Sequence, residues 1–405
     1  MSNRKTTAEK SPPGLLTLVC IAALGAVSMN MFLPSLPSMA KYFSAPSAVM
    51  QLTVSVYLAA SAVFQLIVGP MSDRYGRRIV MLVCVVVFLL GTLVCMVAAN
   101  VEIMILGRII QATSVGGIVL SRAIIRDLYE PSQAASMIAY VTMGMAIGPM
   151  ISPVFGGVID EYLGWQANFV LMFIMGIGVL ALTYYDLGET NKSEFTSFRE
   201  QVKQYPELLR SRRFWGYTAT AAFCSGTFFA FLGGGPFIAT DVLHLSPTQY
   251  GFYFAIVPIG YILGNFISGR LSTTWGISRM ITIGTLVIVF GLLICIGLLS
   301  LGIIHPLAVF GPMFFVGCGN GMTLPNSNAG IVSVRPKLAG TASGLGGSLQ
   351  IGGGAFISVI AGTLVAAQGS TIILFIVMLV SALLAVCSVL YVIYVDHLIA
   401  IGKPT

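Results

Sequence analysis

Gly69-Pro70-Met71-Ser72-Asp73-Arg74-Tyr75-Gly76-Arg77-Arg78 lies between two long apolar runs and carries three arginines and one aspartate. Charged residues make up only 9% of the chain, so this is a large local concentration of charge. Glycines near each end allow the backbone to turn tightly, which predicts a loop between packed helices. A charged loop in this position is typical of a connection between membrane spans. It indicates the machinery of an alternating-access transporter rather than a catalytic site.

Apolar runs recur along the whole chain of 405 residues, 57% of which are hydrophobic. A run of about 18 or more such residues crosses a hydrocarbon core roughly 30 Å thick. The runs lack the alternation of barrel strands, so they predict an all-α polytopic membrane protein. Twelve transmembrane helices are expected at about 15–37, 48–70, 79–98, 103–125, 134–158, 167–186, 214–240, 249–270, 279–302, 306–328, 340–366 and 370–395.

Lysine and arginine divide unequally between the two sides of such a bundle. With a cytoplasmic N-terminus, all but three of the 21 basic residues fall on the cytoplasmic side. Lys41 falls on the other side, and Arg108 and Arg122 lie within the fourth span. The positive-inside rule therefore predicts a multi-pass membrane protein with both termini cytoplasmic. The membrane expected for it, from the resemblance described below, is a bacterial inner membrane. The net charge of +7 follows from this topology and indicates no nucleic-acid partner.

A polar segment at 187–213 divides the predicted spans into two sets of six. Apolar residues recur in it at helical spacing, so we expect an amphipathic helix at the membrane surface. The predicted organisation is an N-terminal six-helix bundle at 1–186, a cytoplasmic linker at 187–213 and a C-terminal six-helix bundle at 214–405.

Three small residues of the quoted stretch return 200 residues later: Gly69, Ser72 and Gly76 recur as Gly269, Ser272 and Gly276. Both sets lie between the second and third spans of their half. The second copy has fewer charges, since Thr273 stands at the position of Asp73. Two pseudo-symmetric halves around a central path are typical of secondary transporters.

Other motifs lie in spans four and five. They read Arg108-Ile109-Ile110-Gln111-Ala112, Ser121-Arg122-Ala123-Ile124-Ile125-Arg126-Asp127 and Gly148-x-x-x-Ser152-Pro153-Val154-Phe155-Gly156-Gly157. With the quoted stretch and twelve spans, they resemble the major facilitator superfamily over the whole chain, and within it the proton-coupled Bcr/CflA group. The resemblance implies export of drugs coupled to inward proton flow, with the proton gradient as energy source and no cofactor.

One position departs from that group, which often has an acidic residue in the first span. Here the corresponding residue is Asn30, which cannot release a proton. No acidic residue lies near the middle of a predicted span, although a proton-coupled carrier usually needs a titratable group at depth. The proton site that the resemblance implies is therefore open, and Asp127 is the remaining candidate.

Candidates for substrate binding or coupling are Asn30, Tyr57, Arg108, Gln111, Arg122, Asp127 and Tyr140. An arginine at the position of Arg108 is costly unless it faces water or a partner, and Gln111 is close enough along a helix to bond it. The alternative is an arginine that reaches to the interface. For Arg122 and Arg126, which share a helix face, interfacial anchoring is the favoured reading. Tyr57 and Tyr140 can instead serve in packing.

The residues Gly69, Asp73, Arg74, Gly76, Arg77 and Arg78 form a predicted cytoplasmic gate. The alternative is a plain positive-inside loop, which leaves Asp73 unexplained. Small residues on span five predict a close helix contact bent by a proline, through Gly148, Pro153, Gly156 and Gly157. The seven cysteines show no metal spacing, and no metal site is expected.

The sequence therefore predicts a drug or multidrug efflux transporter and not an enzyme. Its expected partners are a small-molecule substrate, the lipid bilayer and protons, and a monomer is expected. The alternative is a uniporter or exporter of a small metabolite, such as an amino acid or a sugar, because Asn30 replaces the usual acid. A sensor with a transporter-like body is disfavoured, because the longest polar segment is short.

Overall fold

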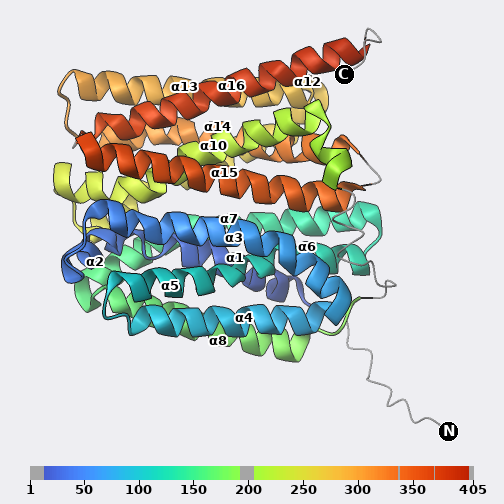
Figure 1. Cartoon of the computed structure of the whole chain (residues 1–405), viewed down its shortest axis with the longest axis horizontal. Helices are drawn as coiled ribbons and strands as arrows, with labels where there is room; N and C mark the ends of the chain where they lie inside the picture. Colours follow the sequence, from blue (N-terminus) through green and yellow to red (C-terminus); the bar gives the residue numbers. More distant parts are fainter. Residues whose placement is uncertain (1–12, 192–204, 336–337, 369, 401–405) are drawn as a thin grey trace.

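The computed structural model describes residues 13–191, 205–335, 338–368 and 370–400, and its elements are helices (Figure 1). The first half comprises α1 (Leu15–Asn30), η1 (Leu33–Ser35), α2 (Leu36–Tyr42), α3 (Ser47–Tyr75), α4 (Arg77–Met96), α5 (Val101–Gln111), η2 (Ala112–Ser114), α6 (Val115–Leu128), α7 (Pro131–Leu163) and α8 (Trp165–Asp186). The second comprises α10 (Arg212–Phe237), η3 (Ile238–Val242), α11 (Pro247–Phe254), α12 (Ile256–Trp275), α13 (Ile277–Ser300), α14 (Pro306–Ser333), α15 (Ala339–Gln368) and α16 (Ile372–Ala400).

Within these residues, 12 helical segments are long and apolar enough to cross a membrane. The predicted number of spans and the all-α fold are confirmed. Several spans consist of two consecutive elements, such as α5 and α6 joined through the 3-10 turn η2. Most of the predicted linker lies outside the described residues, and positions 205–209 of it are helical.

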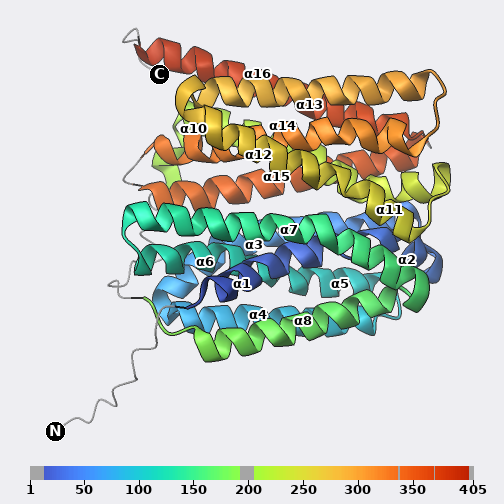
Figure 2. The ribbon, with the colours of Figure 1, turned by 180° about the vertical axis from the view of Figure 1, so that it is seen from behind.

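The two halves lie side by side, with α1–α8 on one side and α10–α16 on the other (Figures 1 and 2). They meet mainly where α3 packs on α15 and where α7 packs on α11. We call the end of the bundle at which α3 and α12 terminate the basic end, because Arg77, Arg126 and Arg335 lie there. The opposite end carries α2 and η3 (Figure 1).

The prediction of a loop across the quoted stretch is wrong, because α3 continues through Pro70 to Tyr75. Only Gly76 breaks the helix, with φ of 95°, a conformation that favours glycine. Its N–H still donates to the carbonyl of Ser72. Gly69 is helical and makes no turn. Charged side chains near a membrane surface reach water while the backbone remains hydrogen-bonded within the helix, so charge alone does not end a helix there.

Candidate functional site

Arg108 is fully buried inside the first half, so the alternative that it reaches the interface is wrong. Its Nη1 donates to the carbonyl of Ser28 at 3.1 Å and to Oε1 of Gln111 at 2.6 Å. Its Nε donates to the carbonyl of Thr53 at 3.4 Å. Gln111 is held in turn, because its Nε2 donates to the hydroxyl of Thr92 at 2.9 Å. These bonds join α1, α3, α4 and α5 around one guanidinium.

Two aromatic rings also contact this guanidinium. Its central carbon lies 4.0 Å from the ring centroid of Phe32 and 4.3 Å from that of Tyr57. A cation–π contact gains about 2 kcal/mol or more when it is shielded from water. The Tyr57 hydroxyl lies 3.1 Å from the carbonyl of Gly25, to which it donates, and 2.9 Å from the hydroxyl of Ser114. The aromatic contacts and the hydrogen bonds fix the arginine in one position.

No acidic side chain neutralises Arg108 in the part of the chain that the structure describes. Its Nη2 has no hydrogen-bond partner there, and neither has the hydroxyl of Ser28 or Oδ1 of Asn30. Asn30 is buried and donates from its amide nitrogen to the carbonyl of Ala26 at 2.7 Å. We call Arg108, Gln111, Tyr57, Phe32 and Thr92 the Arg108 cluster. It holds a buried positive charge, and Nη2 of Arg108 can donate further hydrogen bonds.

A second group of side chains surrounds Arg77 at the basic end. Arg77 forms ion pairs with Asp73 and with Asp127, whose Oδ2 lies 3.0 Å from its Nε. Its Nη1 donates to the hydroxyl of Ser72. Glu189 lies beyond the sixth span and accepts from the backbone N–H of Arg77 at 2.9 Å. A carboxylate at the N-terminus of α4 also opposes the positive end of that helix. We call these residues the Arg77 network.

The other arginines of the predicted gate also contact the first half. Arg78 donates to the carbonyl of Tyr184 at 2.9 Å, and its guanidinium stacks on that ring at 5.3 Å. The guanidinium of Arg74 lies over Tyr75 at 5.1 Å. Asp127 belongs to this group because it pairs with Arg77, and it does not lie with the Arg108 cluster.

The equivalent stretch of the second half has the same backbone and different contacts. Gly276 breaks the helix with φ of 83°, as Gly76 does. In place of ion pairs, the hydroxyl of Ser268 accepts from Nδ2 of Asn326 at 2.8 Å. Arg270 stacks on Phe266 at 4.7 Å. No ion pair joins residues 269–279 to another described residue.

A cavity of about 610 Å³ lies between the halves at the basic end. We call it the vestibule. Its first wall includes Gln65, Gly69, Asp73, Arg77, Arg122 and Arg126, and its second wall includes Thr341, Ser343 and Gly344. Arg122 is close enough to Tyr261 of α12 to interact with it electrostatically across the halves. A smaller hollow of about 350 Å³ lies at the opposite end, against α3 and α10.

Helix α7 carries the small residues Gly148, Pro153, Gly156 and Gly157. Gly148 and Gly156 face α1, where a methyl group on Gly156 would meet the carbonyl of Met31. Gly157 faces α11 of the other half, where the carbonyl of Pro247 leaves no room for a methyl group. Close contact of backbones explains why only small residues fit there. The motif therefore packs α7 against both halves near the opposite end.

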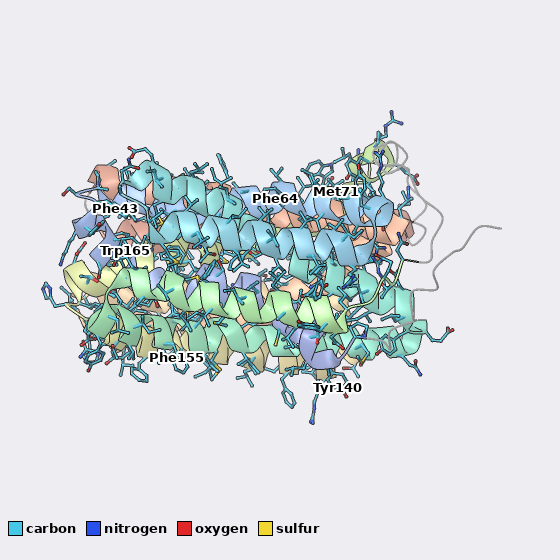
Figure 3. All side chains as sticks on the ribbon, turned by 90° about the horizontal axis from the view of Figure 1, so that it is seen from below. Phe43, Phe64, Met71, Tyr140, Phe155 and Trp165 are labelled. Atoms are coloured by element: carbon cyan, nitrogen blue, oxygen red, sulfur yellow. The ribbon has the colours of Figure 1, made fainter. Side chains whose placement is uncertain are left out.

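Tyr140 does not join any of these groups. It is 52% exposed on α7 and lies at the outer surface, apart from the central path (Figure 3). The structure therefore does not bring Tyr140 together with the other candidates, because a lone aromatic residue does not reveal which way its helix face points.

Two acids of the structure were missed from the sequence. Glu189 caps α4 from more than 100 positions away, and no local spacing indicates that contact. Asp160 of α7 is the one buried carboxylate among the described residues, 7% exposed, and accepts from the hydroxyl of Ser38 at 2.7 Å. Its neighbour Glu161 accepts from the N–H of Thr248 in the other half at 3.3 Å. Asp160 and Glu161 are adjacent in the sequence, but they lie near the end of a predicted span, where acidic residues are not unusual.

The sequence matches a known family model and is similar to proteins of other bacteria. Residues 18–357 match the family model described as Major Facilitator Superfamily. The chain is 32% identical over 350 residues to a Bacillus subtilis protein described as an uncharacterized MFS-type transporter, YdgK, covering 84% of this chain and 86% of that one. It is 29% identical to a bicyclomycin resistance protein homolog of Haemophilus influenzae, covering 87% and 89%.

The fold is similar to a solved structure of a D-xylose–proton symporter, with a TM-score of 0.76 at 15% identity, covering 93% of this chain and 96% of that one. At this identity the likeness concerns the fold alone. The similarity of the fold and the family match agree with each other over most of the chain.

Proposed function

Because the chain belongs to the Major Facilitator Superfamily, we propose that it exports small amphipathic compounds from a bacterial cell by alternating access. As a family member it is a membrane transporter of small molecules and not an enzyme. Drug or multidrug efflux is the proposed activity, because relatives at modest identity are named for drug resistance. The class of compound exported is part of what we propose.

The proposal places the basic end in the cytoplasm of a bacterial inner membrane, with both termini on that side. The concentration of arginine there supports this orientation through the positive-inside rule. The moving parts are the bundles at 1–186 and 214–405 joined by the linker at 187–213, and one chain is the working unit. Lipid surrounds it and no nucleic acid takes part.

The observation that carries the proposal is the difference between the two ends of the bundle. The vestibule separates the halves at the basic end, and its volume lies within the range of small-molecule sites. At the opposite end Gly157 and Gly251 bring α7 and α11 into backbone contact across the halves. A transporter in this state receives a compound at the basic end. Rocking of the halves would then close that end and separate α7 from α11.

The Arg77 network supports a role in gating. Its ion pairs and hydrogen bonds join residues of the first half and Glu189, so none of these contacts holds the halves together at the basic end in this state. A gate needs contacts that differ between two states. We propose that Asp73 and its arginine neighbours hold the basic end closed when the cavity faces the other way.

Coupling to protons is the finer part of the proposal. We retain Asp127 as the proton carrier and add Asp160. Asp160 is buried and accepts from Ser38, and its neighbour Glu161 bonds Thr248 of the other half, so opening of the opposite end would change its surroundings. Asp127→Asn and Asp160→Asn distinguish the two. The variant that lacks the carrier keeps exchange of substrate for substrate and loses accumulation driven by a proton gradient. Normal gradient-driven transport in both variants would contradict both assignments.

A strain that lacks its own efflux pumps provides the test of the function. Production of this protein should raise resistance to at least one of bicyclomycin, chloramphenicol and sulfonamides. Arg108→Ala should abolish that resistance, because it removes the charge at the centre of four helices. Unchanged susceptibility to all three compounds would count against drug export.

A second candidate function is supported by Asn30. Its side chain occupies the place of an acid, and no carboxylate bonds the Arg108 cluster in the described residues. A uniporter or exporter of an amino acid or sugar needs no proton site. Competition of such metabolites with a labelled drug, together with transport indifferent to pH, would favour this function.

A further inference from the structure

The charges of the vestibule do not balance. The charged residues that line it are Asp73, Arg77, Arg122 and Arg126. Arg77 pairs with Asp73, which lines the vestibule, and with Asp127, which does not, so this group holds one more acid than base. Among the lining residues alone, three arginines face one aspartate. Arg122 and Arg126 are left without an acidic partner among the described residues. The vestibule therefore has an excess of positive charge on its first wall.

The second wall adds no acid. Its lining residues from α15 are uncharged: Gly340, Thr341, Ser343, Gly344 and Leu345. The exposed Ser343 places a hydroxyl on the wall opposite the two guanidinium groups, and this wall adds no charge of its own.

Arg122 is the better placed of the two arginines. It is half-buried and forms no hydrogen bond or ion pair with another described residue, while Tyr261 and Arg126 act on it electrostatically. Arg122 and Arg126 are four positions apart on α6, a spacing at which like charges destabilise each other. An anion between them would relieve that repulsion. A guanidinium binds a carboxylate or phosphate through two parallel hydrogen bonds.

Anchoring at the membrane surface is the competing explanation for two arginines near a span end. An anchoring side chain extends toward lipid headgroups at the outside of the bundle. Arg122 and Arg126 instead line a cavity between the halves. Deeper in the first half, Arg108 is a further positive charge without an acidic partner among the described residues.

We propose that Arg122 and Arg126 bind an anionic group of the transported compound, so that this protein selects organic anions over lipophilic cations. The inference rests on the proposed function, since it names the substrate class of the same central path. The anionic group is a carboxylate or a phosphate. The arginines act before the halves rock, when a compound enters from the basic end.

Binding to the purified full chain in detergent tests this site with matched probes: 2-naphthoate, 2-naphthyl phosphate, 2-naphthamide and 2-naphthylmethylammonium. Equilibrium dialysis should show that one of the anions binds roughly tenfold or more tightly than the amide, as expected for a charge-assisted pair. The ammonium should bind weakest. Comparison of naphthoate with naphthyl phosphate identifies which anion the site prefers.

Arg122→Gln should remove most of the preference for the anion while affinity for the amide stays the same. Arg126→Gln should remove part of it and serves if the first variant unfolds. Arg270→Gln is the matched control, because Arg270 stacks on Phe266 and does not line the vestibule. Equal affinity for anion and amide in the wild type, including no measurable binding of either, would overturn the inference. An anion preference that persists in both variants would also overturn it.

The outcome separates this inference from the proposed function. Preference for the anion without any export in cells leaves the site standing and rejects drug export. Export of neutral drugs without any preference for the anion keeps the proposed function and rejects the site.

Discussion

Residues 69–78 and 269–279 form the same backbone with different chemistry. In both, a long helix ends at a glycine with positive φ and a new helix begins at the next residue. Only the first copy ties its helices to α6 and to Glu189 through Arg77. The comparison separates two roles: the glycine provides the turn in both halves, and the charges join elements in one half.

The Arg77 network explains why the charges are concentrated in one copy. Its three side-chain partners come from the end of α3 and from α6, so it fixes these helices relative to α4. The second half achieves a similar connection with neutral groups, through Ser268 and Asn326. A bond between neutral groups is weaker than a charge-assisted one. The two halves are therefore expected to tolerate substitution here to different degrees.

Removing the charged side chain should have the largest effect. Arg77→Ala leaves Asp73 and Asp127 unpaired, and loss of one partner of a buried ion pair costs about 3 kcal/mol. We expect a lower unfolding temperature in detergent and little export. Arg279→Ala in the second half, whose side chain has no ion pair with a described residue, should change the free energy of unfolding by less than about 0.5 kcal/mol. Equal losses in both variants would remove the asymmetry.

Substitution of the two turn glycines should have the next largest effect. Gly76→Ala and Gly276→Ala both force alanine into a conformation that costs about 1–3 kcal/mol. A methyl group on Gly76 would also meet the carboxylate of Glu189, whereas Gly276 faces open space. Thermal unfolding should therefore show a larger loss for Gly76→Ala. Equal losses would mean that Glu189 moves away without cost, and a larger loss for Gly276→Ala would contradict the expected order.

Restoring charge to the second copy should have the smallest effect. The double variant Thr273→Asp, Ile277→Arg places an acid and a base on either side of the break at Gly276, and an exposed ion pair is worth about 0.5 kcal/mol. The free energies of the single and double variants form a cycle whose coupling measures the new pair. The coupling of this new pair should be smaller than the coupling between Asp73 and Arg77. Equal couplings would mean that Asp127 does not strengthen the pair between Asp73 and Arg77.

Much of the fold follows from sequence, because a bilayer allows few ways to satisfy the backbone. Apolar runs predicted the twelve spans, and the paired glycines predicted the breaks at Gly76 and Gly276. The same reasoning wrongly extended the break to Gly69. Its helix continues because the charged side chains there need water but the backbone does not.

The site was predicted less completely, since its contacts join distant positions. The three-residue spacing predicted the bond between Arg108 and Gln111, which lies within one helix. It did not predict the pairing of Arg77 with Asp127, which lies 50 positions away, or the outward position of Tyr140. Such contacts depend on how helices rotate and pack, and a single sequence does not specify this.

The central claim is that this protein takes up compounds at the basic end and exports them in exchange for protons, which move down their gradient. Inside-out membrane vesicles expose that end to the medium and test the claim directly, with labelled chloramphenicol or an anion that binds the purified protein. With the vesicle interior acidified, wild-type vesicles should accumulate the compound, and collapse of the gradient should release it. Vesicles with Arg108→Ala should not accumulate it. Accumulation that is the same with and without the gradient would contradict proton coupling, and no accumulation of any compound would contradict export.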